Sequence, residues 1–88
     1  MATIYRVDGT LETVIPATGG EFTLDEVQNI VGGYVELVRL TKGFFLVDED
    51  GRYKGLPLNL QATALATLSH GPLTIVGTAL HTNDKEFT

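Results

Sequence analysis

Two short signatures in the middle of the chain each join a helix to an extended segment within a few residues. The first is GGYVE at residues 32–36, where two glycines follow an amphipathic stretch and a β-rich run begins at once. Glycine most readily adopts the left-handed conformation that ends a helix. The second is GRYKGLPLN at residues 51–59, which predicts a turn, a short basic strand and a rigid lead-in to another helix. Both signatures put polar side chains at the ends of regular elements, where binding groups are commonly displayed.

A short helix is predicted over residues 24–31. Thr23 and Glu26 form a capping box, in which the threonine hydroxyl accepts from the backbone N–H of Glu26 and the glutamate carboxylate accepts from that of Thr23. Phe22 precedes the cap and is expected to pack on Val27 as a hydrophobic staple. Apolar residues then recur at helical spacing, so this helix is expected to bury one face.

The N-terminal segment predicts a β-hairpin. Residues 3–7 and 10–15 are β-rich, and Asp8 and Gly9 lie between them. Asp-Gly between β-rich runs is a strong hairpin signal, because both turn positions favour positive φ. Pro16 ends the second strand, since it has no N–H to donate to the ladder.

The central segment predicts two strands and a candidate third. Residues 34–40 carry apolar side chains on both faces of the pleat, so we expect this strand to be covered on both sides. Residues 44–47 form the next strand and residues 48–51 an acidic turn. Residues 52–54 are a candidate short strand that continues the meander.

The C-terminal part predicts a helix, a strand and a tail. Asn59 is a good N-cap for a helix over residues 60–68. The side chains expected to face inward from this helix are Leu60, Ala64, Leu65 and Leu68. Residues 73–80 predict the last strand, and residues 82–88 a polar tail.

The predicted order is therefore β-β-α-β-β-(β)-α-β. It corresponds to a single α+β domain over residues 1–81, in which a mostly antiparallel sheet carries two short helices.

Charge and size narrow the range of partners. The net charge of −5, from eleven acids and six bases, disfavours a DNA or RNA polymer as partner. No apolar stretch approaches the roughly 20 residues needed to cross a bilayer, so no membrane partner is expected and a cytoplasmic location is the default. A chain of this size buries only about 60–65% of the surface that its unfolded form exposes. It has no cysteine for disulfides, so we expect a homo-oligomer, with a marginally stable monomer as the alternative.

The sequence contains no constellation typical of an enzyme. An active site needs a nucleophile–base pair, paired carboxylates or a metal cluster. His70, His81 and Asp84 follow no familiar spacing of metal ligands, and the acidic run at residues 48–51 lacks the alternating oxygens of a calcium loop. The glycine pairs match no phosphate-binding motif. We therefore expect a non-enzymatic protein without a metal or cofactor.

Basic, aromatic and amide side chains point instead to binding. Arg52 and Lys54 lie just before the helix that Asn59 opens, so an anion could be held between these bases and the helix N-terminus. In the alternative, Asn59 only caps and Lys54 only solubilises. The phenols that could stack on a base or a ribose, or pack in the core or an interface, are Tyr5, Tyr34 and Tyr53.

Five strings along the chain carry a family resemblance. They are GGYVE at 32–36, LVDEDG at 46–51, KGLPLN at 54–59, AT at 62–63 and IVG at 75–77. Together they resemble a family of small domains of unknown function that are frequent in bacteriophages and their bacterial hosts, over roughly residues 3–81. The family pattern is GGYIE, then V-N-E-x-G-x-x-K-G-L-P-x-N-x-x-A-T, then I-V-G. Asp48 stands where the family often has asparagine, which argues against a side-chain amide role there.

The chain is also similar to phage anti-defence sponges of the Thoeris type. This resemblance implies a protein that binds a cyclic ADP-ribose signal or a cyclic oligonucleotide without cleaving it, in pockets between the subunits of an oligomer. The candidate residues come from the physical interpretation above. They are Arg39, Arg52 and Lys54 for phosphate, Tyr34 or Tyr53 for stacking, and Glu36 or Asn59 for a ribose or base edge.

Two other functions stay open. A small acidic protein-binding module could dock on a host protein through its acidic surface and a β-rich edge. A small hydrolase or phosphodiesterase is the third hypothesis, and it would be recognised by product formed from a cyclic nucleotide.

Overall fold

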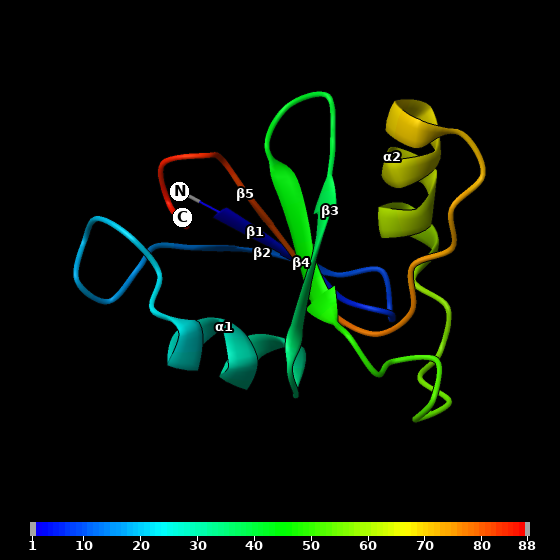
Figure 1. Ribbon diagram of the computed structural model, residues 1–88, viewed down its shortest axis with the longest axis horizontal. Coiled ribbons are helices and arrows are strands. Elements are labelled where there is room, and N and C mark those ends of the chain that lie inside the picture. Colours follow the sequence, from blue (N-terminus) through cyan, green and yellow to red (C-terminus); the bar gives the residue numbers. More distant parts are fainter. Residues whose placement is uncertain (1, 88) are drawn as a thin grey trace.

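Within residues 2–87, which the computed structural model describes, five antiparallel strands form one sheet with a helix on each face (Figure 1). In chain order the elements are β1 (Ala2–Tyr5), β2 (Leu11–Val14), α1 (Leu24–Val31), β3 (Val35–Arg39), β4 (Phe44–Asp48), α2 (Leu60–His70) and β5 (Ala79–Thr82). The strands lie in the order β2-β1-β5-β4-β3. The first strand therefore lies between the second and the last.

This architecture confirms the predicted α+β class and the order of elements apart from one short strand. Residues 52–54 form turns instead of a strand. The backbone N–H of Lys54 donates to the carbonyl oxygen of Asp50 at 2.9 Å and closes the segment on itself. The turn brings Lys54 back toward the strand that precedes it.

The last strand begins later than predicted. The prediction places it over residues 73–80, whereas β5 begins at Ala79. The earlier part of that run pairs with the lead-in to α2, where Val76 forms an isolated bridge with Leu58. Because this pairing satisfies backbone groups outside the sheet, only the end of the run is left for β5.

α1 forms by the local signals that predict it. The hydroxyl of Thr23 accepts from the backbone N–H of Glu26 at 3.1 Å, and the Glu26 carboxylate accepts from that of Thr23 at 2.9 Å. Hydrogen bonds from the backbone N–H groups of Thr23 and Ala17 hold the pKa of Glu26 below its ordinary value. The helix ends at Gly32, which has φ 91° and donates its N–H to the carbonyl oxygen of Gln28 at 2.8 Å.

Alternating side chains of β4 divide the core into two layers. Phe44 and Leu46 face α1, while Phe45 and Val47 face α2, and all four are buried. The other buried residues on the α1 face are Ala2, Ile4, Phe22, Val27, Val31 and Leu80. Those on the α2 face are Leu40, Ala62, Ala66, Ile75 and Ala79.

β4, and not β3, is the strand covered on both sides. The prediction that residues 34–40 hold that position is wrong, because β3 is an edge strand that pairs with β4. Glu36, Leu37 and Arg39 on β3 are exposed. Polar groups on this strand are therefore available at the surface.

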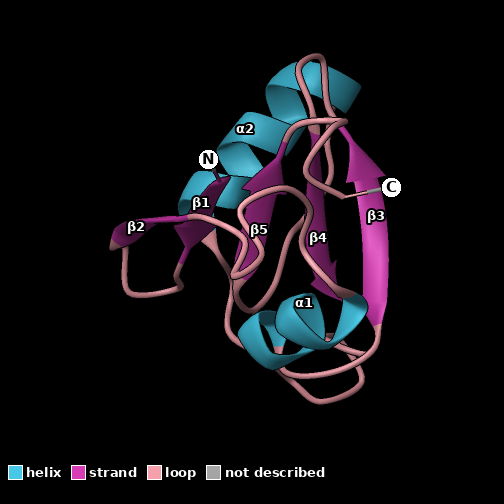
Figure 2. Ribbon diagram, turned by 90° about the vertical axis from the view of Figure 1, so that its left-hand side faces the viewer, coloured by secondary structure: helices cyan, strands magenta, loops and turns pink. Residues whose placement is uncertain are grey.

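α2 packs on the opposite face from α1, behind the sheet in Figure 2, with a different set of residues from the predicted one. Ala62 and Ala66 are fully buried, whereas Leu60 and Leu68 are 71% and 85% exposed. Of the residues predicted to face inward, Leu65 alone is half-buried. The prediction of the buried face of this helix is therefore wrong.

Hydrogen bonds to a distant segment set the rotation of α2. The hydroxyl of Thr63 donates to the carbonyl oxygen of Ile75 at 3.2 Å and accepts from its N–H at 2.8 Å. This pairing turns Ala62 and Ala66 toward the sheet, where their small side chains allow the helix to lie close to the ring of Phe45.

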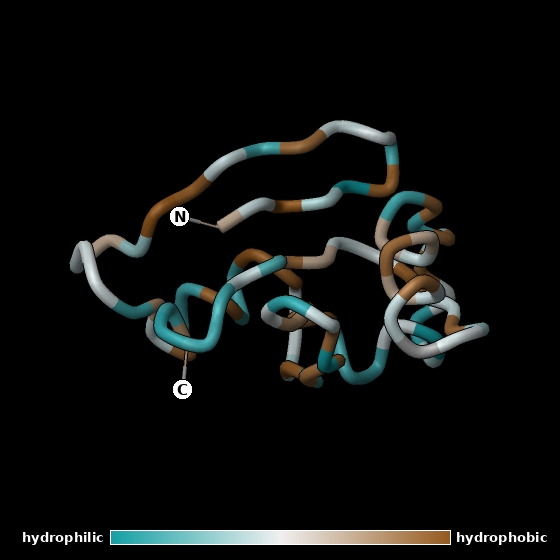
Figure 3. The backbone as a smooth tube through the Cα atoms, turned by 90° about the horizontal axis from the view of Figure 1, so that it is seen from above, coloured by the Kyte–Doolittle hydropathy of each residue, from teal (hydrophilic) through white to brown (hydrophobic). Residues whose placement is uncertain are grey.

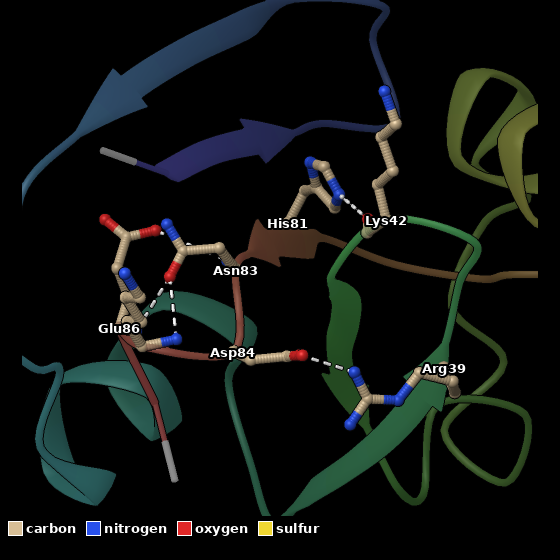
Figure 4. Close-up of polar contacts among 7 residues, drawn as sticks. Arg39, Lys42, His81, Asn83, Asp84 and Glu86 are labelled. Atoms are coloured by element: carbon tan, nitrogen blue, oxygen red, sulfur yellow. Dashed lines mark hydrogen bonds and ion pairs between the residues drawn. The ribbon is translucent and has the colours of Figure 1, made fainter.

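Residues 83–87 fold back onto the α1 face of the sheet. The side-chain oxygen of Asn83 accepts from the backbone N–H of Glu86 at 3.0 Å and shapes a turn (Figure 4). The N–H of Phe22 donates to the carbonyl oxygen of Glu86 at 2.6 Å, and Phe87 packs against the buried residues under α1. The segment predicted as a polar tail thus packs on the sheet through Glu86 and Phe87, while Asn83, Asp84 and Lys85 are exposed.

Candidate functional site

The six binding candidates do not form one site. They are Tyr34, Glu36, Arg39, Arg52, Lys54 and Asn59, and they are distributed over three surface cavities and the core. The pleat of β3 directs Glu36 and Arg39 to opposite faces of the sheet. Two pairs do come together, Glu36 with Arg52 and Tyr34 with Lys54.

Asn59 is a structural residue, which removes it from the binding candidates. Its side chain is fully buried, and its oxygen accepts from the backbone N–H of Ala62 at 3.1 Å. Its amide nitrogen donates to the carbonyl oxygens of Tyr5 at 2.8 Å and of Gly77 at 2.9 Å. A side chain with no exposed surface and these partners cannot reach a ligand, so only the capping interpretation of Asn59 remains.

Arg39 lies alone on the α1 side. Its guanidinium forms an ion pair with Asp84 (Figure 4). It also lies 5.0 Å from the ring centroid of Phe44. The cavity beside it, of about 280 Å³, is otherwise lined by Leu37 and Phe87. Because both partners of the ion pair are largely exposed, Arg39 is available to solvent but distant from the other candidates.

Glu36 and Arg52 border a small cavity on the α2 side. Its volume is about 140 Å³, and Glu49 and Asp48 add acidic groups to its lining. The Arg52 guanidinium donates to the backbone carbonyl oxygen of Thr74 at 2.8 Å. Ligand pockets typically measure about 300–1,000 Å³, so this cavity is too small to enclose a nucleotide.

The widest of the three cavities lies at the junction of α1, β3 and the turn before α2. We call it the Tyr34 cleft, and it is lined by Gln28, Gly33, Tyr34, Asp50 and Lys54. Its volume is about 310 Å³, and the phenol of Tyr34 is 70% exposed beside it. The cleft therefore combines an aromatic ring, an ammonium, an amide and a carboxylate around one opening.

A half-buried ion pair holds Lys54 at the edge of the Tyr34 cleft. The ammonium of Lys54 lies 2.7 Å from a carboxylate oxygen of Asp48, and the Asp48 side chain is almost completely buried. Lys54 also donates to the backbone carbonyl oxygen of Gly32 at 3.2 Å, at the end of α1. These contacts fix the position of the ammonium, while 43% of the lysine side chain stays exposed.

The charge of Asp48 depends on this pair. Burial raises the pKa of Asp48, but the hydrogen bond from Lys54, the hydrogen bond from the backbone N–H of Asp50 and the Lys54 charge together bring that pKa below its ordinary value. Asp48 is therefore ionised at neutral pH. An aspartate at this position gives Lys54 a full counter-charge, which the neutral amide of an asparagine would not provide.

Gly33 gives the ion pair the space that it needs. A Cβ at this position would lie 2.7 Å from the Lys54 nitrogen and 3.0 Å from both carboxylate oxygens of Asp48. The second glycine of the GGYVE string is thus explained by the close approach of the ion pair, whereas the first is the helix cap.

Two residues of the cleft were missed by sequence reasoning. Gln28 lies one turn before the cap of α1, and Asp50 lies in the acidic turn after β4. The available signal was their spacing, since Gln28 precedes Gly32 by one helical turn and Asp50 follows Asp48 by two residues.

The remaining tyrosines lie outside the Tyr34 cleft. Tyr5 packs edge-on against Phe45, with 5.4 Å between ring centroids, and against His81 at 6.4 Å. Tyr53 is 95% exposed in the turn before α2. Tyr34 is therefore the phenol with a cavity beside it.

Of the three residues weighed as metal ligands, the two whose side chains are described each have another partner. The Nε2 atom of His81 lies 3.0 Å from the backbone carbonyl oxygen of Lys42, and Asp84 pairs with Arg39 (Figure 4). The side chain of His70 lies outside the described part of the structure. Among the side chains that are described, no three His, Cys, Asp or Glu residues are grouped to hold a metal ion.

Neither helix in the described range is long and apolar enough to span a membrane. No curated protein and no solved structure gives a significant match to the chain. One family matches residues 2–88, nearly the full length, and its description is "Domain of unknown function (DUF3846)". The chain therefore belongs to the DUF3846 family of small domains whose function is not known.

Proposed function

We propose that this protein binds and sequesters a nucleotide-derived signal, without cleaving it, in the Tyr34 cleft. The observation that supports the proposal most directly is the grouping of four kinds of recognition group around one opening of about 310 Å³. In the specific form, the protein is a phage-type immune-evasion protein and its ligand is a cyclic ADP-ribose isomer or a cyclic oligonucleotide.

Each group at the cleft has a partner on such a ligand. The exposed ring of Tyr34 offers a face on which a base can stack, since every base has a π-face. The ammonium of Lys54 meets a phosphate oxygen, and the carboxylate of Asp50 accepts hydrogen bonds from ribose hydroxyls. The amide of Gln28 both donates and accepts, as the polar edge of a base requires.

The charges around the cleft favour a ligand with few phosphates. Lys54 is the base in its lining, and Asp50 and the underlying Asp48 are acids. A nucleoside triphosphate would be repelled by these carboxylates. A cyclic signal with one or two phosphates carries less charge and presents more ring surface to Tyr34.

The size of the cleft limits how much of the ligand one chain covers. A cavity of about 310 Å³ is at the lower end of the range for ligand pockets, so it holds one nucleoside-sized part. The rest of the ligand extends over the neighbouring surface, where the exposed Arg52 lies in the same turn as Asp50.

The test is ligand binding by two matched tyrosine variants. Isothermal calorimetry and melting shifts with cyclic ADP-ribose isomers and cyclic dinucleotides are expected to show binding by the wild type and by Tyr53→Ala. Tyr34→Ala should lose about tenfold or more in affinity, the usual scale of a stacking contact. Tyr53 is the control because it is an exposed phenol outside the lining of the cleft.

Three outcomes would contradict the proposal. Absence of binding to every cyclic nucleotide offered would remove the sponge function. Equal loss in both tyrosine variants would remove the Tyr34 cleft as its site. A cleaved ligand in the recovered material would favour the hydrolase or phosphodiesterase hypothesis instead.

A second candidate function is a protein-binding module, favoured by the two edges of the sheet. β2 and β3 are the outer strands in the described sheet, and each has an outer backbone edge that another chain could extend. A stoichiometric partner from host lysate that binds a ligand-free protein, and is lost when proline replaces Leu37 on β3, would favour this function.

A further inference from the structure

The backbone of β3 faces β4 and solvent by turns. The N–H of Leu40 donates to the carbonyl oxygen of Gly43 at 3.1 Å, just after the strand. Just before it, the N–H of Glu49 donates to the carbonyl oxygen of Tyr34 at 2.8 Å. Because successive residues of a strand turn their backbone groups to opposite sides, the even-numbered residues face β4. The N–H and C=O groups that point outward, which we call the β3 edge, are those of Val35, Leu37 and Arg39.

The β3 edge is open within residues 2–87. β4 is the strand that pairs with β3 there, and in Figure 2 β3 is the rightmost strand of the sheet. Among these described residues, the backbone hydrogen bonds made outside helices and strands include none from Val35, Leu37 or Arg39. An edge of this kind can accept one more strand, whose main chain supplies the missing partners.

Two cavities flank β3, one on each face of the sheet. The cavity on the α1 side measures about 280 Å³, and its apolar lining is Leu37 with the rings of Phe44 and Phe87. The cavity on the α2 side measures about 140 Å³, and its lining includes Glu36 and Glu49. A strand added beside β3 would direct its own side chains to these two faces in alternation, so each face selects a different kind of side chain.

The α1 face beside β3 suits an apolar side chain. Leu37 is 47% exposed, and the cavity next to it has the two phenylalanine rings as a wall. Arg39 and Asp84, which complete the lining, already form an ion pair with each other. This face therefore offers apolar contact and no unpaired charge.

The α2 face beside β3 suits a basic side chain. Among the described residues, the ion pairs include neither Glu36 nor Glu49. Arg52 is the base in the lining of that cavity, whereas Asp48 is neutralised by Lys54. Two unpaired carboxylates against one guanidinium leave this face negative, so it attracts a cation.

The charges single out β3 among the two outer strands. β2, which lies in the hairpin along the upper side of Figure 3, has Glu12 as its acid, and Glu12 is paired with Arg6. They also disfavour a second copy of the chain as the added strand, because it would bring a net charge of −5 to a negative face. A basic partner is attracted both by this face and by the chain as a whole.

We propose that β3 receives an extended antiparallel segment of a basic protein in which apolar and basic residues alternate. Antiparallel pairing continues the pattern of the sheet, and it places directly opposite residues on the same face. The apolar residues lie opposite Leu37 and its odd-numbered neighbours and exchange backbone hydrogen bonds with them. The basic residues project on the other face, toward Glu36. The proposal specifies the edge and the partner of the protein-binding function named above as the second candidate, and it does not depend on nucleotide binding.

Synthetic peptides test the register. The probe is a capped heptapeptide that alternates lysine and valine, titrated to millimolar concentration and followed by the amide NMR signals of the protein. Methylation of the central valine nitrogen is expected to abolish binding, because that N–H faces β3, whereas methylation of a neighbouring lysine nitrogen, which faces solvent, should be tolerated. No binding of the unmethylated peptide, or a loss at least as large from the lysine methylation, would overturn the proposal.

Charge reversal tests the kind of partner. Glu36→Lys should weaken binding of the lysine–valine peptide about tenfold and should strengthen binding of the matching glutamate–valine peptide. The control is Asp25→Lys, which makes the same change in charge at an exposed acid in the first turn of α1. Equal effects of the two substitutions would show that net charge, and not the face beside β3, selects the peptide.

Hydrogen exchange locates the bound peptide. The peptide should slow exchange at the amides of Val35, Leu37 and Arg39, whereas those of Glu36 and Val38 face β4 and should be slow with and without it. Slow exchange at all five amides in the peptide-free protein, together with a dimer in sedimentation velocity, would show that a second copy occupies the edge and would overturn the proposal. Since no nucleotide is present, failure here and failure of the ligand proposal are separate results.

Discussion

The two helices of this domain differ in the size of the side chains that they bury. α1 follows the usual pattern, with Val27 and Val31 buried and acidic residues toward solvent. α2 buries Ala62 and Ala66 and exposes Leu60 and Leu68. The difference shows that hydrophobicity decides the orientation of a helix only when no stronger directional contact opposes it.

The contacts that orient the two helices differ in their reach along the chain. α1 is held by a capping box between Thr23 and Glu26 that lies within one turn. α2 is held by Asn59, whose amide joins the helix to Tyr5 at the other end of the sequence. The capping box of α1 does not constrain which face of the helix is buried, so the apolar pattern decides it. The long-range hydrogen bonds of Asn59 fix the rotation of α2 against its apolar pattern.

Asn59→Ala should produce the largest effect, because it removes the contact that orients α2. The substitution leaves the carbonyl oxygens of Tyr5 and Gly77 and the N–H of Ala62 without their partner in a buried position. We expect a loss of roughly 2–4 kcal/mol in the free energy of unfolding, measured by urea denaturation at low protein concentration. Loss of a simple helix cap costs about 1 kcal/mol. A measured loss no larger than this would show that the Asn59 amide acts as a cap alone.

Exchanging small and large residues across α2 sharpens the comparison. Ala66→Leu places a large side chain against a closely packed sheet and should lower the free energy of unfolding by about 1–3 kcal/mol. Leu68→Ala removes an exposed side chain and should change it by about 0.5 kcal/mol or less in dilute monomer. A reversed order of these two effects in thermal or urea unfolding would contradict the observed rotation of the helix.

Lys54→Met tests the tie between the end of α1 and the turn that leads to α2. It leaves the buried carboxylate of Asp48 without its counter-charge, and we expect a loss of about 1–2 kcal/mol at neutral pH, since Lys54 is itself partly exposed. In the wild type, the pKa of Asp48 is lower in the folded than in the unfolded protein. The ionised carboxylate therefore contributes stability at any pH above its ordinary pKa. This contribution is lost as the pH falls through the pKa of Asp48 in the folded protein.

The pH dependence of the variant provides the control. Without Lys54, burial is expected to raise the pKa of Asp48, so protonation in acid relieves an unpaired charge. The difference in unfolding free energy between wild type and Lys54→Met should therefore narrow as the pH falls through the acidic range. A difference that does not change with pH would mean that Lys54 acts through packing.

Thr23→Ala is expected to have a smaller effect than Asn59→Ala, Ala66→Leu or Lys54→Met, because it removes a local cap at an exposed position. The backbone N–H of Glu26 loses its partner, but water can replace the hydroxyl. We expect about 1 kcal/mol in urea unfolding, with Thr23→Ser close to wild type. A loss as large as that of Asn59→Ala would remove the distinction between local and long-range anchoring.

The range of these contacts also explains what the sequence could predict. The fold class and α1 follow from neighbouring residues, such as Thr23 with Glu26 and the glycine at residue 32, and all of these signals are visible in one short window. The burial of Asn59 could not be read in this way, because its partner Tyr5 is distant in sequence and a capping asparagine is usually exposed. The start of β5 could not be predicted for the same reason, since the pairing of Val76 with Leu58 depends on tertiary structure.

The candidate site was predictable only in part. Tyr34 and Lys54 were nominated and do share a cleft. The separation of Glu36 from Arg39 follows from the two-residue period of a strand and was available from the sequence. Gln28 and Asp50 are marked in the sequence only by their spacing from Gly32 and Asp48, because their place in the cleft comes from the junction of α1 with the turn before α2.

The pairing of the first strand with the last has a mechanical consequence. Thr3 is opposite His81 and Tyr5 is opposite Ala79, so the chain leaves β1 and β5 at the same end of their shared ladder. A pulling force applied through the two ends of the domain would first peel residues 83–87 from the sheet. The force would then act on the hydrogen bonds between β1 and β5 one residue pair after another, so that each breaks before the next is loaded. Strands that leave at opposite ends would instead share the load across every bond. This domain is therefore built to yield at low force when it is stretched by its ends.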